Sequence, residues 1–294
     1  MYYPEMTQHH LIFRFAILLL GSRLWLGCAA EDSSTDERFS ITFQDVNRFV
    51  HVHVPDGYSA DTPVPLVVAL HGAGDTGGNF QRSAGIDALA DKYGFVVAYP
   101  SASTNNWAEG CNCNRPDLDG VDDVGFTDEV LNLLKGKYAI DSSRMFVIGF
   151  SQGGMFTQRL ACERSEVYKG FSTVAAMISE PLSRVCRPPN TVNMLMINGT
   201  ADSILPFSGI PSGSFATKGA YETLTMWKDR NECTGPINTQ NFRNDSPTTL
   251  LHNVLGCPGN ADLRLYEIRG GRHEWPRGAF DAPKTIVEYF GLTQ

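Results

Sequence analysis

The stretch that decides the fold is Arg144-Met145-Phe146-Val147-Ile148-Gly149-Phe150-Ser151-Gln152-Gly153-Gly154-Met155. Its apolar first half predicts a buried strand, which runs directly into Gly-Phe-Ser-Gln-Gly and then into a helical pattern. The glycines on both sides of Ser151 let the chain turn sharply without a clash of Cβ atoms. This strand–turn–helix order predicts a nucleophile elbow, which raises a serine hydroxyl above a sheet and points the next helix N-terminus at it.

Short apolar runs alternate with helical patterns on both sides of this turn. Strands are predicted at residues 65–70, 95–99, 145–148, 194–197 and 263–268, and helices at 86–93, 124–138, 153–163, 220–231 and 282–290. Period-two alternation at 39–43 and 49–54 adds an antiparallel strand pair at the start. The fold class is therefore predicted as α/β, an α/β-hydrolase with a mainly parallel sheet and helices on both faces.

The serine of such an elbow needs an acid and then a histidine later in the chain. Two histidines follow Ser151. His273 lies in a loop between the last predicted strand and the last helix, whereas His252 lies in an apolar stretch without loop glycines. Asp202 follows the strand at 194–197 and is expected to hold the imidazole in the right tautomer, with helix capping as its alternative role. We therefore expect Ser151, Asp202 and His273 as catalytic residues.

Backbone amides are expected to complete the site. A tetrahedral oxyanion needs N–H donors from the residue after the nucleophile and from the loop after an early strand. Gln152 is the first of these, and Ala73 in the loop at 71–75 is the second. His71 in the same loop is expected to shape it through hydrogen bonds rather than to take part in catalysis.

Aromatic and histidine side chains outside the triad give weaker signals. Trp107 and Trp275 are candidate substrate-binding faces for an aromatic acyl group or a sugar ring, with a wall or core position as the alternative. His51 and His53 share one strand face, but no third ligand accompanies them in the sequence. Neither a metal nor a cofactor is therefore predicted.

The first thirty residues have the layout of an export signal. Its apolar core, residues 11–20, is too short to span a bilayer, for which a helix needs about 20 residues. Cleavage after Ala30 and a lipoprotein-type route with a lipid on Cys28 both remain open, and a mispredicted start is a third reading. The expected domains are an export signal at 1–30, a polar tether at 31–38 and a hydrolase domain at 39–294.

Six cysteines remain for the fold once Cys28 is assigned to the signal, namely Cys111, Cys113, Cys162, Cys186, Cys233 and Cys257. An even number in an exported chain suggests disulfides. Sequence proximity favours Cys162–Cys186 and Cys233–Cys257. Cys111 is then left to pair with Cys113 across one residue or to stay reduced. A metal site would need CxxC pairs or nearby histidines, which this pair lacks.

Charge and composition exclude several classes of protein. The formal net charge is −8, from 24 Lys and Arg against 32 Asp and Glu, and no basic cluster is present. This argues against binding to nucleic acid or to an anionic membrane. With 42% hydrophobic and 19% charged residues, the 294-residue chain is not a disordered, collagen-like or coiled-coil protein.

Taken together, these stretches resemble the secreted esterases grouped as polyhydroxybutyrate depolymerase-like and feruloyl esterase-like enzymes, related to carbohydrate esterase family 1. The residues that carry the resemblance are Leu70-His71-Gly72, Val121-Asp122-Asp123-Val124-Gly125-Phe126, Asp141 with Arg144, Gly149-Phe150-Ser151-Gln152-Gly153-Gly154-Met155, Leu160-Ala161-Cys162, Gly199-Thr200-Ala201-Asp202 and His273-Glu274-Trp275-Pro276. The resemblance runs from about residue 48 to 292. It implies hydrolysis of esters of plant-wall phenolic acids, acetylated sugars or hydroxyalkanoates.

Two positions depart from the pattern of that family. Asn198 stands where histidine is common, and Phe207 stands where tyrosine is common. These changes leave the triad intact and affect the substrate side of the site.

The sequence thus predicts an exported, monomeric serine ester hydrolase, either secreted or held at the cell surface or in the periplasm as a lipoprotein. Its expected partner is an ester substrate, linked to a polysaccharide or part of a polyester, and contact with a membrane is expected only through a lipid on Cys28. Two other functions remain open. One is a serine peptidase on the same fold, and the other is a surface binding protein that has lost catalysis.

Overall fold

The computed structural model describes residues 35–243 and 246–293, so the predicted export signal and Cys28 lie outside the described residues. Every element described below belongs to one compact unit, residues 32–294. No helix within the described ranges is long and apolar enough to cross a membrane.

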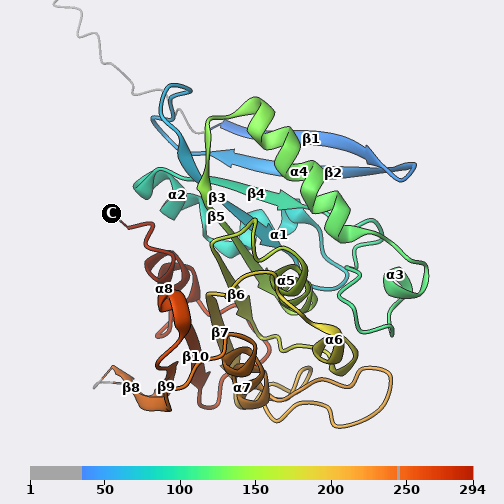
Figure 1. Cartoon of the computed structure of the whole chain (residues 1–294). Coiled ribbons are helices and arrows are strands. Elements are labelled where there is room, and N and C mark those ends of the chain that lie inside the picture. Colours follow the sequence, from blue (N-terminus) through green and yellow to red (C-terminus); the bar gives the residue numbers. More distant parts are fainter. Residues whose placement is uncertain (1–34, 244–245, 294) are drawn as a thin grey trace, which may run out of the picture. The chain divides into compact units, whose positions relative to one another are not determined.

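A mixed sheet runs through this unit, and its ten described strands follow the order β1-β2-β4-β3-β5-β6-β7-β10-β9-β8 (Figure 1). The strands are β1 (Thr35–Phe43), β2 (Val46–Val54), β3 (Val64–Leu70), β4 (Val96–Pro100), β5 (Ile140–Phe150), β6 (Gly170–Val174), β7 (Met194–Gly199), β8 (Ile237–Arg243), β9 (Ser246–Val254) and β10 (Leu263–Ile268). All neighbours from β4 to β10 in this order are parallel, and the pairs at both edges are antiparallel. The predicted mainly parallel sheet with an antiparallel N-terminal pair is therefore confirmed.

Helices cover both faces of the sheet, as predicted (Figure 1). They are α1 (Gly77–Ala84), α2 (Asp87–Tyr93), α3 (Arg115–Leu118), α4 (Asp123–Lys137), α5 (Gln152–Glu163), α6 (Glu180–Val185), α7 (Ala220–Arg230) and α8 (Ala282–Tyr289), with a 3-10 turn at Pro258–Asn260. Successive residues of β3 point to opposite faces of the sheet. Val68 belongs to the core with α4, α5 and α7, whereas Val67 belongs to the core with α1, α2 and α8.

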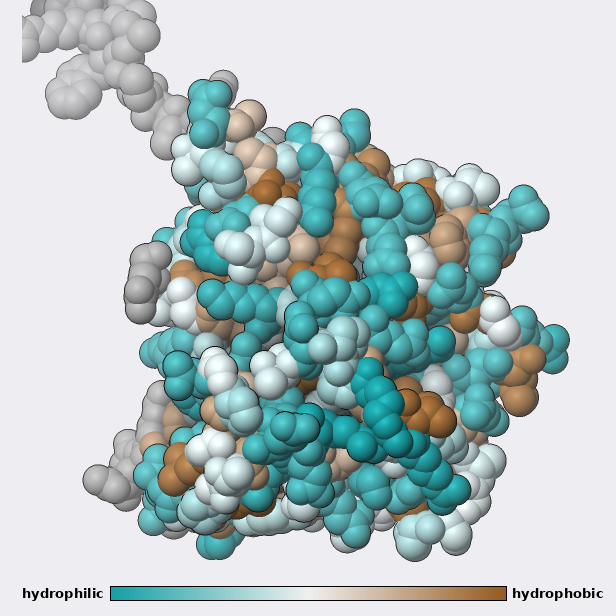
Figure 2. Space-filling model, in the orientation of Figure 1, coloured by the Kyte–Doolittle hydropathy of each residue, from teal (hydrophilic) through white to brown (hydrophobic). Residues whose placement is uncertain are grey.

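Polar side chains predominate on the outer surface of one face of the molecule. Figure 2 shows the face that carries α4, α5 and α7, where hydrophilic residues predominate and apolar residues form separate spots. The helices α4, α5 and α7 contribute buried apolar side chains to the core on one face of the sheet, and α1, α2 and α8 to the core on the other.

The first strand begins earlier than expected. Residues 35–38, assigned above to a polar tether, form the start of β1 and pair in register with the end of β2. The carboxylate of Asp36 accepts a hydrogen bond from His53 (2.9 Å), and the guanidinium of Arg38 lies 4.6 Å from the centre of the Phe49 ring. The expected boundary was wrong because polar contacts, which hydrophobic alternation does not reveal, hold this half of the strand.

Three disulfides are present in the described part of the chain, and all three pairings considered from the sequence are confirmed. Cys162–Cys186 joins the end of α5 to the end of α6, and Cys233–Cys257 joins the segment after α7 to the segment after β9. Cys111–Cys113 closes a small ring across one residue, with 5.1 Å between the Cα atoms. None of the six cysteines is therefore a free thiol.

Candidate active site

Ser151 lies at the sharp turn between β5 and α5. Its backbone has φ 53° and ψ −122°, a conformation that residues other than glycine seldom adopt. A Cβ atom on Gly149 would lie 2.2 Å from the carbonyl oxygen of Gly153, and one on Gly153 would lie 2.3 Å from that of Leu70. Only glycine fits at these two positions, which is why the sequence needs both for the serine to stand at this turn.

A continuous chain of hydrogen bonds joins Ser151 to two distant loops. Ser151 Oγ lies 2.9 Å from His273 Nε2, and His273 Nδ1 lies 2.7 Å from Asp202 Oδ2. The other oxygen of Asp202, Oδ1, accepts the backbone N–H groups of Ile204 and Leu205, both at 2.8 Å. The carboxylate is buried and fully occupied, so its orientation towards the imidazole is fixed.

The loops that carry Asp202 and His273 are locked together. The backbone N–H of Ala201 donates to the carbonyl of Gly271 (2.9 Å), and the N–H of Gly270 donates to Thr200 Oγ1 (2.9 Å). These loops follow the parallel neighbours β7 and β10, whose carboxyl ends lie at one edge of the sheet. The register of the two strands thus brings together residues that are 71 positions apart.

His252, the other histidine after Ser151, is held elsewhere. It lies buried in β9, where Nδ1 is 2.7 Å from the hydroxyl of Tyr221 and Nε2 is 3.1 Å from a carboxylate oxygen of Glu267. Both of its ring nitrogens are therefore occupied by partners outside the triad.

The two expected oxyanion donors lie on segments that meet at Ser151. Gln152 is the first residue of α5, so its N–H has no acceptor within the helix. In the part of the chain that the structure describes, neither this amide nor that of Ala73 has a hydrogen-bond partner. The loop containing Ala73 is close to the serine, because a Cβ atom on Gly72 would lie 3.4 Å from Ser151 Cβ.

His71 shapes this loop. Its Nδ1–H donates to the carbonyl of Gly72 (2.8 Å), and Nε2 accepts the backbone N–H of Ala102 (3.1 Å). Burial lowers the pKa of His71, so the ring is neutral and its tautomer is set by these two bonds.

The prediction of a substrate-binding face is wrong for Trp107. Its side chain is 0% exposed, its ring is stacked on Phe156 with 5.0 Å between centroids, and its Nε1–H donates to the carbonyl of His71 (2.9 Å). No face of the ring is open to a ligand, because the loop folds inwards and packs the ring under residues 71–72.

Trp275 is half-buried. Its Nε1–H donates to the carbonyl of Ala84 (2.9 Å), and its ring meets the rings of Phe80 and Phe150 edge to face. The ring of Phe150 lies 5.3 Å from that of His273, so Trp275 stands one ring away from the triad.

Sequence reasoning missed an acid behind Gln152. Glu109 is only 2% exposed, and its Oε2 accepts hydrogen bonds from Gln152 Nε2 (3.0 Å) and from the side chain of Asn114. Burial, together with the nearby charge of Asp117, raises the pKa of Glu109 to about 8. The only signal in the sequence was its place between Trp107 and the first cysteine of the Cys-x-Cys pair.

A family model described as Esterase PHB depolymerase matches residues 50–180. The chain is 29% identical over 245 residues to a putative esterase, NocK, from Nocardia uniformis subsp. tsuyamanensis, covering 76% of this chain and 69% of the relative. It is 28% identical over 239 residues to a probable feruloyl esterase C from Aspergillus niger, covering 81% of each. It also matches a longer relative, a bifunctional acetylxylan esterase/xylanase from Neocallimastix patriciarum, at 26% identity, but spans only 31% of that protein.

Solved structures share the fold. An acetyl xylan esterase from Aspergillus awamori superposes with a TM-score of 0.65 at 18% identity, covering 87% of this chain and 99% of that one. A CE1 ferulic acid esterase from Anaeromyces mucronatus gives 0.58 at 15% identity, covering 89% and 92%. The esterase relatives and the shared fold agree that this chain is a carboxylic ester hydrolase built on an α/β-hydrolase fold, and its residues 50–180 are similar to the Esterase PHB depolymerase family.

Proposed function

We propose that this protein is an exported serine esterase that cleaves carboxylic esters through an acyl-enzyme on Ser151. The observation that carries the proposal is the unbroken path of hydrogen bonds from Ser151 Oγ through His273 to Asp202. The three residues follow β5, β10 and β7, so a parallel sheet holds them at its carboxyl edge.

In the proposed reaction, Ser151 Oγ attacks the ester carbonyl carbon while His273 Nε2 takes the hydroxyl proton. Asp202 accepts a hydrogen bond from Nδ1–H and stabilises the imidazolium that forms. The backbone N–H groups of Gln152 and Ala73 bind the oxyanion, aided by the positive end of α5. His273 then protonates the leaving alkoxide and activates a water molecule, whose attack frees the acid and restores Ser151.

For the substrate, we infer an ester of a phenolic or acetyl group on a polysaccharide, or a hydroxyalkanoate polyester. The resemblance of the motifs and the relatives named as feruloyl and acetylxylan esterases support this class. Trp275 is the remaining candidate for contact with the acyl group, because Phe150 joins it to the triad.

Export is supported by the disulfides and by the N-terminal sequence. Three disulfides form most readily outside the cytosol, and the N-terminal pattern of the sequence is that of a signal. Cleavage after Ala30 and lipidation of Cys28 are the two routes we propose. Mass spectrometry of the N-terminal peptide from the exporting cell would distinguish the lipid from the cleaved form.

The test of the proposed function is ester hydrolysis by the mature chain and its Ser151→Ala variant. We expect the variant to lose about four orders of magnitude in kcat on p-nitrophenyl acetate, because the nucleophile is gone. Ser59→Ala, at an exposed turn after β2, is the matched control and should keep full activity. A panel of methyl ferulate, acetylated xylan and hydroxybutyrate oligomers then identifies the substrate. Unchanged hydrolysis by Ser151→Ala would contradict the proposal.

A further inference from the structure

The side chain of Gln152 is held from behind by the loop that follows β4. Its Oε1 accepts the backbone N–H of Trp107 (3.1 Å), and its Nε2 donates to Glu109 Oε2 (3.0 Å). Gln152 is buried, and these partners fix both ends of its amide. The backbone N–H of Gln152 is the first proposed oxyanion donor. Because the loop is hydrogen-bonded to the side chain of Gln152, a movement of the loop would displace this donor.

The same loop also holds the segment of the second donor. The indole Nε1–H of Trp107 donates to the carbonyl of His71 (2.9 Å), and the N–H of Gly74 donates to the carbonyl of Asn105 (2.8 Å). Residues 105–109 therefore bond to both sides of Ala73 and to Gln152. One short stretch of chain ties together the two halves of the proposed oxyanion hole.

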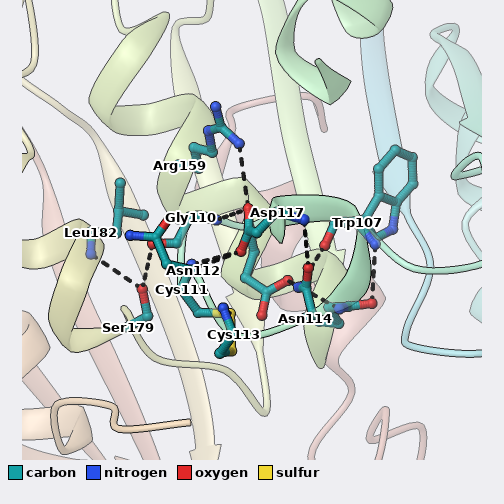
Figure 3. Close-up of a disulfide and its surroundings, with 12 residues drawn as sticks. Trp107, Gly110, Cys111, Asn112, Cys113, Asn114, Asp117, Arg159, Ser179 and Leu182 are labelled. Atoms are coloured by element: carbon teal, nitrogen blue, oxygen red, sulfur yellow. Dashed lines mark hydrogen bonds and ion pairs between the residues drawn. A yellow bond between two sulfur atoms is a disulfide. The ribbon is translucent and has the colours of Figure 1, made fainter. Parts of the chain in front are cut away.

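This stretch is fixed in turn by a dense set of contacts around the Cys111–Cys113 disulfide (Figure 3). The carboxylate of Asp117 accepts three backbone N–H groups, those of Gly110, Cys111 and Asn112. The side chain of Asn114 donates both to the carbonyl of Trp107 and to Glu109. The ring begins two residues after Glu109 and limits the freedom of the chain at that point.

We propose that Glu109 is a positioning residue of the oxyanion hole, which holds Gln152 while the Cys111–Cys113 loop holds Glu109. The inference rests on the proposed function, because it takes the amide of Gln152 as a donor to the oxyanion. Glu109 does not touch the substrate in this scheme. It acts through Gln152, and it therefore affects the stabilisation of the transition state, measured as kcat, rather than substrate binding.

The charge of Glu109 matters for this role. Its pKa of about 8 makes the side chain neutral at pH 7, where it accepts two hydrogen bonds without placing a negative charge behind the oxyanion. Above pH 8, Glu109 is mostly ionised, and its negative charge repels the developing oxyanion and disfavours the transition state. The maximum rate should therefore fall as pH rises through 8.

Other charged groups around this acid come from three helices and one strand. Asp117 of α3 raises the pKa of Glu109. Arg159 of α5 donates to the carbonyl of Ala108 (2.7 Å), and Asp123 of α4 accepts the N–H of Ala108 (2.7 Å). Arg48 of β2 pairs with Asp123 (2.6 Å), so these two charges offset each other. Within the described chain, Glu109 has no ion pair that would keep it ionised at pH 7.

The experiment compares kcat and KM of the full mature chain with those of Glu109→Gln and Glu109→Ala between pH 6.5 and 9.5. Glutamine keeps the two accepted hydrogen bonds but cannot ionise. We expect kcat of the parent protein to fall about tenfold above pH 8 with KM unchanged, and Glu109→Gln to remain level across this range. Glu109→Ala should lower kcat about tenfold at pH 7, because Gln152 loses its partner. Asp119→Asn, an exposed charge on the same loop, should follow the parent profile.

Identical pH profiles of the parent protein and Glu109→Gln would overturn the inference, as would a loss of kcat at pH 7 in Glu109→Gln equal to that in Glu109→Ala. Because glutamine preserves shape and hydrogen bonding, Glu109→Gln keeps the test valid if Glu109→Ala does not fold. Ser151→Ala separates the two proposals. If Ser151→Ala remains active, the proposed function fails. If it is inactive while both Glu109 variants behave like the parent protein, only the positioning role fails.

Discussion

At the scale of single residues, the surroundings of Asp202 set the outcome of its simplest substitution. Two backbone N–H groups donate to Oδ1, and His273 Nδ1–H donates to Oδ2. In Asp202→Asn, the amide oxygen should face the backbone donors and the NH2 group should face His273. The imidazole would then carry its proton on Nε2 and could not accept that of Ser151.

We therefore expect Asp202→Asn to lower kcat about 10⁴-fold with a nearly unchanged Tm. Rates on p-nitrophenyl acetate, read beside a thermal melt, check this. Asp229→Asn, an exposed position on α7, is the control. A loss of less than tenfold would mean that the tautomer of His273 does not depend on Asp202.

Two glycines provide a matched test of the tight turn. A Cβ atom on Gly153 would meet backbone carbonyls of Leu70 and His71 at 2.3 and 2.5 Å, whereas one on Gly136, on the exposed side of α4, would meet nothing within 4 Å. Gly153→Ala should cost about 1–3 kcal/mol of stability and reduce kcat about a hundredfold by displacing Gln152. Gly136→Ala should stabilise the protein by about 1 kcal/mol. Urea unfolding and kcat measure both, and equal behaviour of the two variants would contradict the prediction.

The order Ser151, Asp202, His273 could be predicted because each residue follows a recognisable apolar strand. Trp107 and Glu109 could not be placed, since no periodic pattern tells which way an irregular loop turns its side chains. The loop turns both inwards, and so the candidate substrate contact became a core residue and the buried acid went unnoticed.

At the scale of elements, the strands that the sequence did not predict are those that depend on their neighbours. Strand β6 reads Gly-Phe-Ser-Thr-Val and carries Ser172 and Thr173 in fully buried positions. Pairing with β5 on one side and β7 on the other makes it a strand in spite of its polar residues. The hairpin of β8 and β9 is also rich in polar residues and extends the sheet at one edge through antiparallel pairing with β10.

Two of the disulfides close loops of different size and should therefore contribute differently to the stability of the protein. The Cys162–Cys186 loop spans 24 positions and should contribute about 3 kcal/mol to stability, whereas the Cys111–Cys113 ring should contribute only about half as much. We expect the paired serine substitutions of Cys162 and Cys186 to lower stability most. Those of Cys111 and Cys113 should lower kcat severalfold, because they loosen the loop behind Gln152.

Urea unfolding and kcat of the two double variants, measured side by side, check this. If Cys111→Ser with Cys113→Ser leaves kcat unchanged, the ring does not support the site. A larger loss of stability in this variant than in the other would contradict the argument from loop size.

At the scale of the whole molecule, the two halves of the chain supply different parts of the site. The stretch 50–180 matched by the family model contains Ser151, Gln152 and Ala73, whereas Asp202 and His273 lie beyond it. The central parallel strands join the halves, since β5, β6, β7 and β10 are consecutive neighbours. The pairing of these four strands therefore brings the proposed nucleophile and the proposed base together.

The attachment of the first strand to this sheet should make stability depend on pH. His53 of β2 lies 2.9 Å from Asp36 of β1 and 2.7 Å from Asp91 of α2, so one imidazole links three elements. Burial lowers the pKa of His53, but the hydrogen bond to Asp36 and the charges of Asp87 and Asp91 outweigh it and raise the pKa above its ordinary value. His51, on the same strand, has its pKa lowered by burial and by nearby arginines.

The two histidines should therefore act with opposite signs. Stabilisation by His53 is full below its unfolded pKa of about 6.5 and is lost as pH rises through the raised folded pKa. That of His51 is present above the unfolded pKa and is lost as pH falls. Urea unfolding between pH 5.5 and 8.5 should show that the stability of the parent protein declines as pH rises. His53→Gln should abolish this decline, and His51→Gln should make it steeper. The same pH slope in the parent protein and both variants would show that β1 is held without a charge on His53.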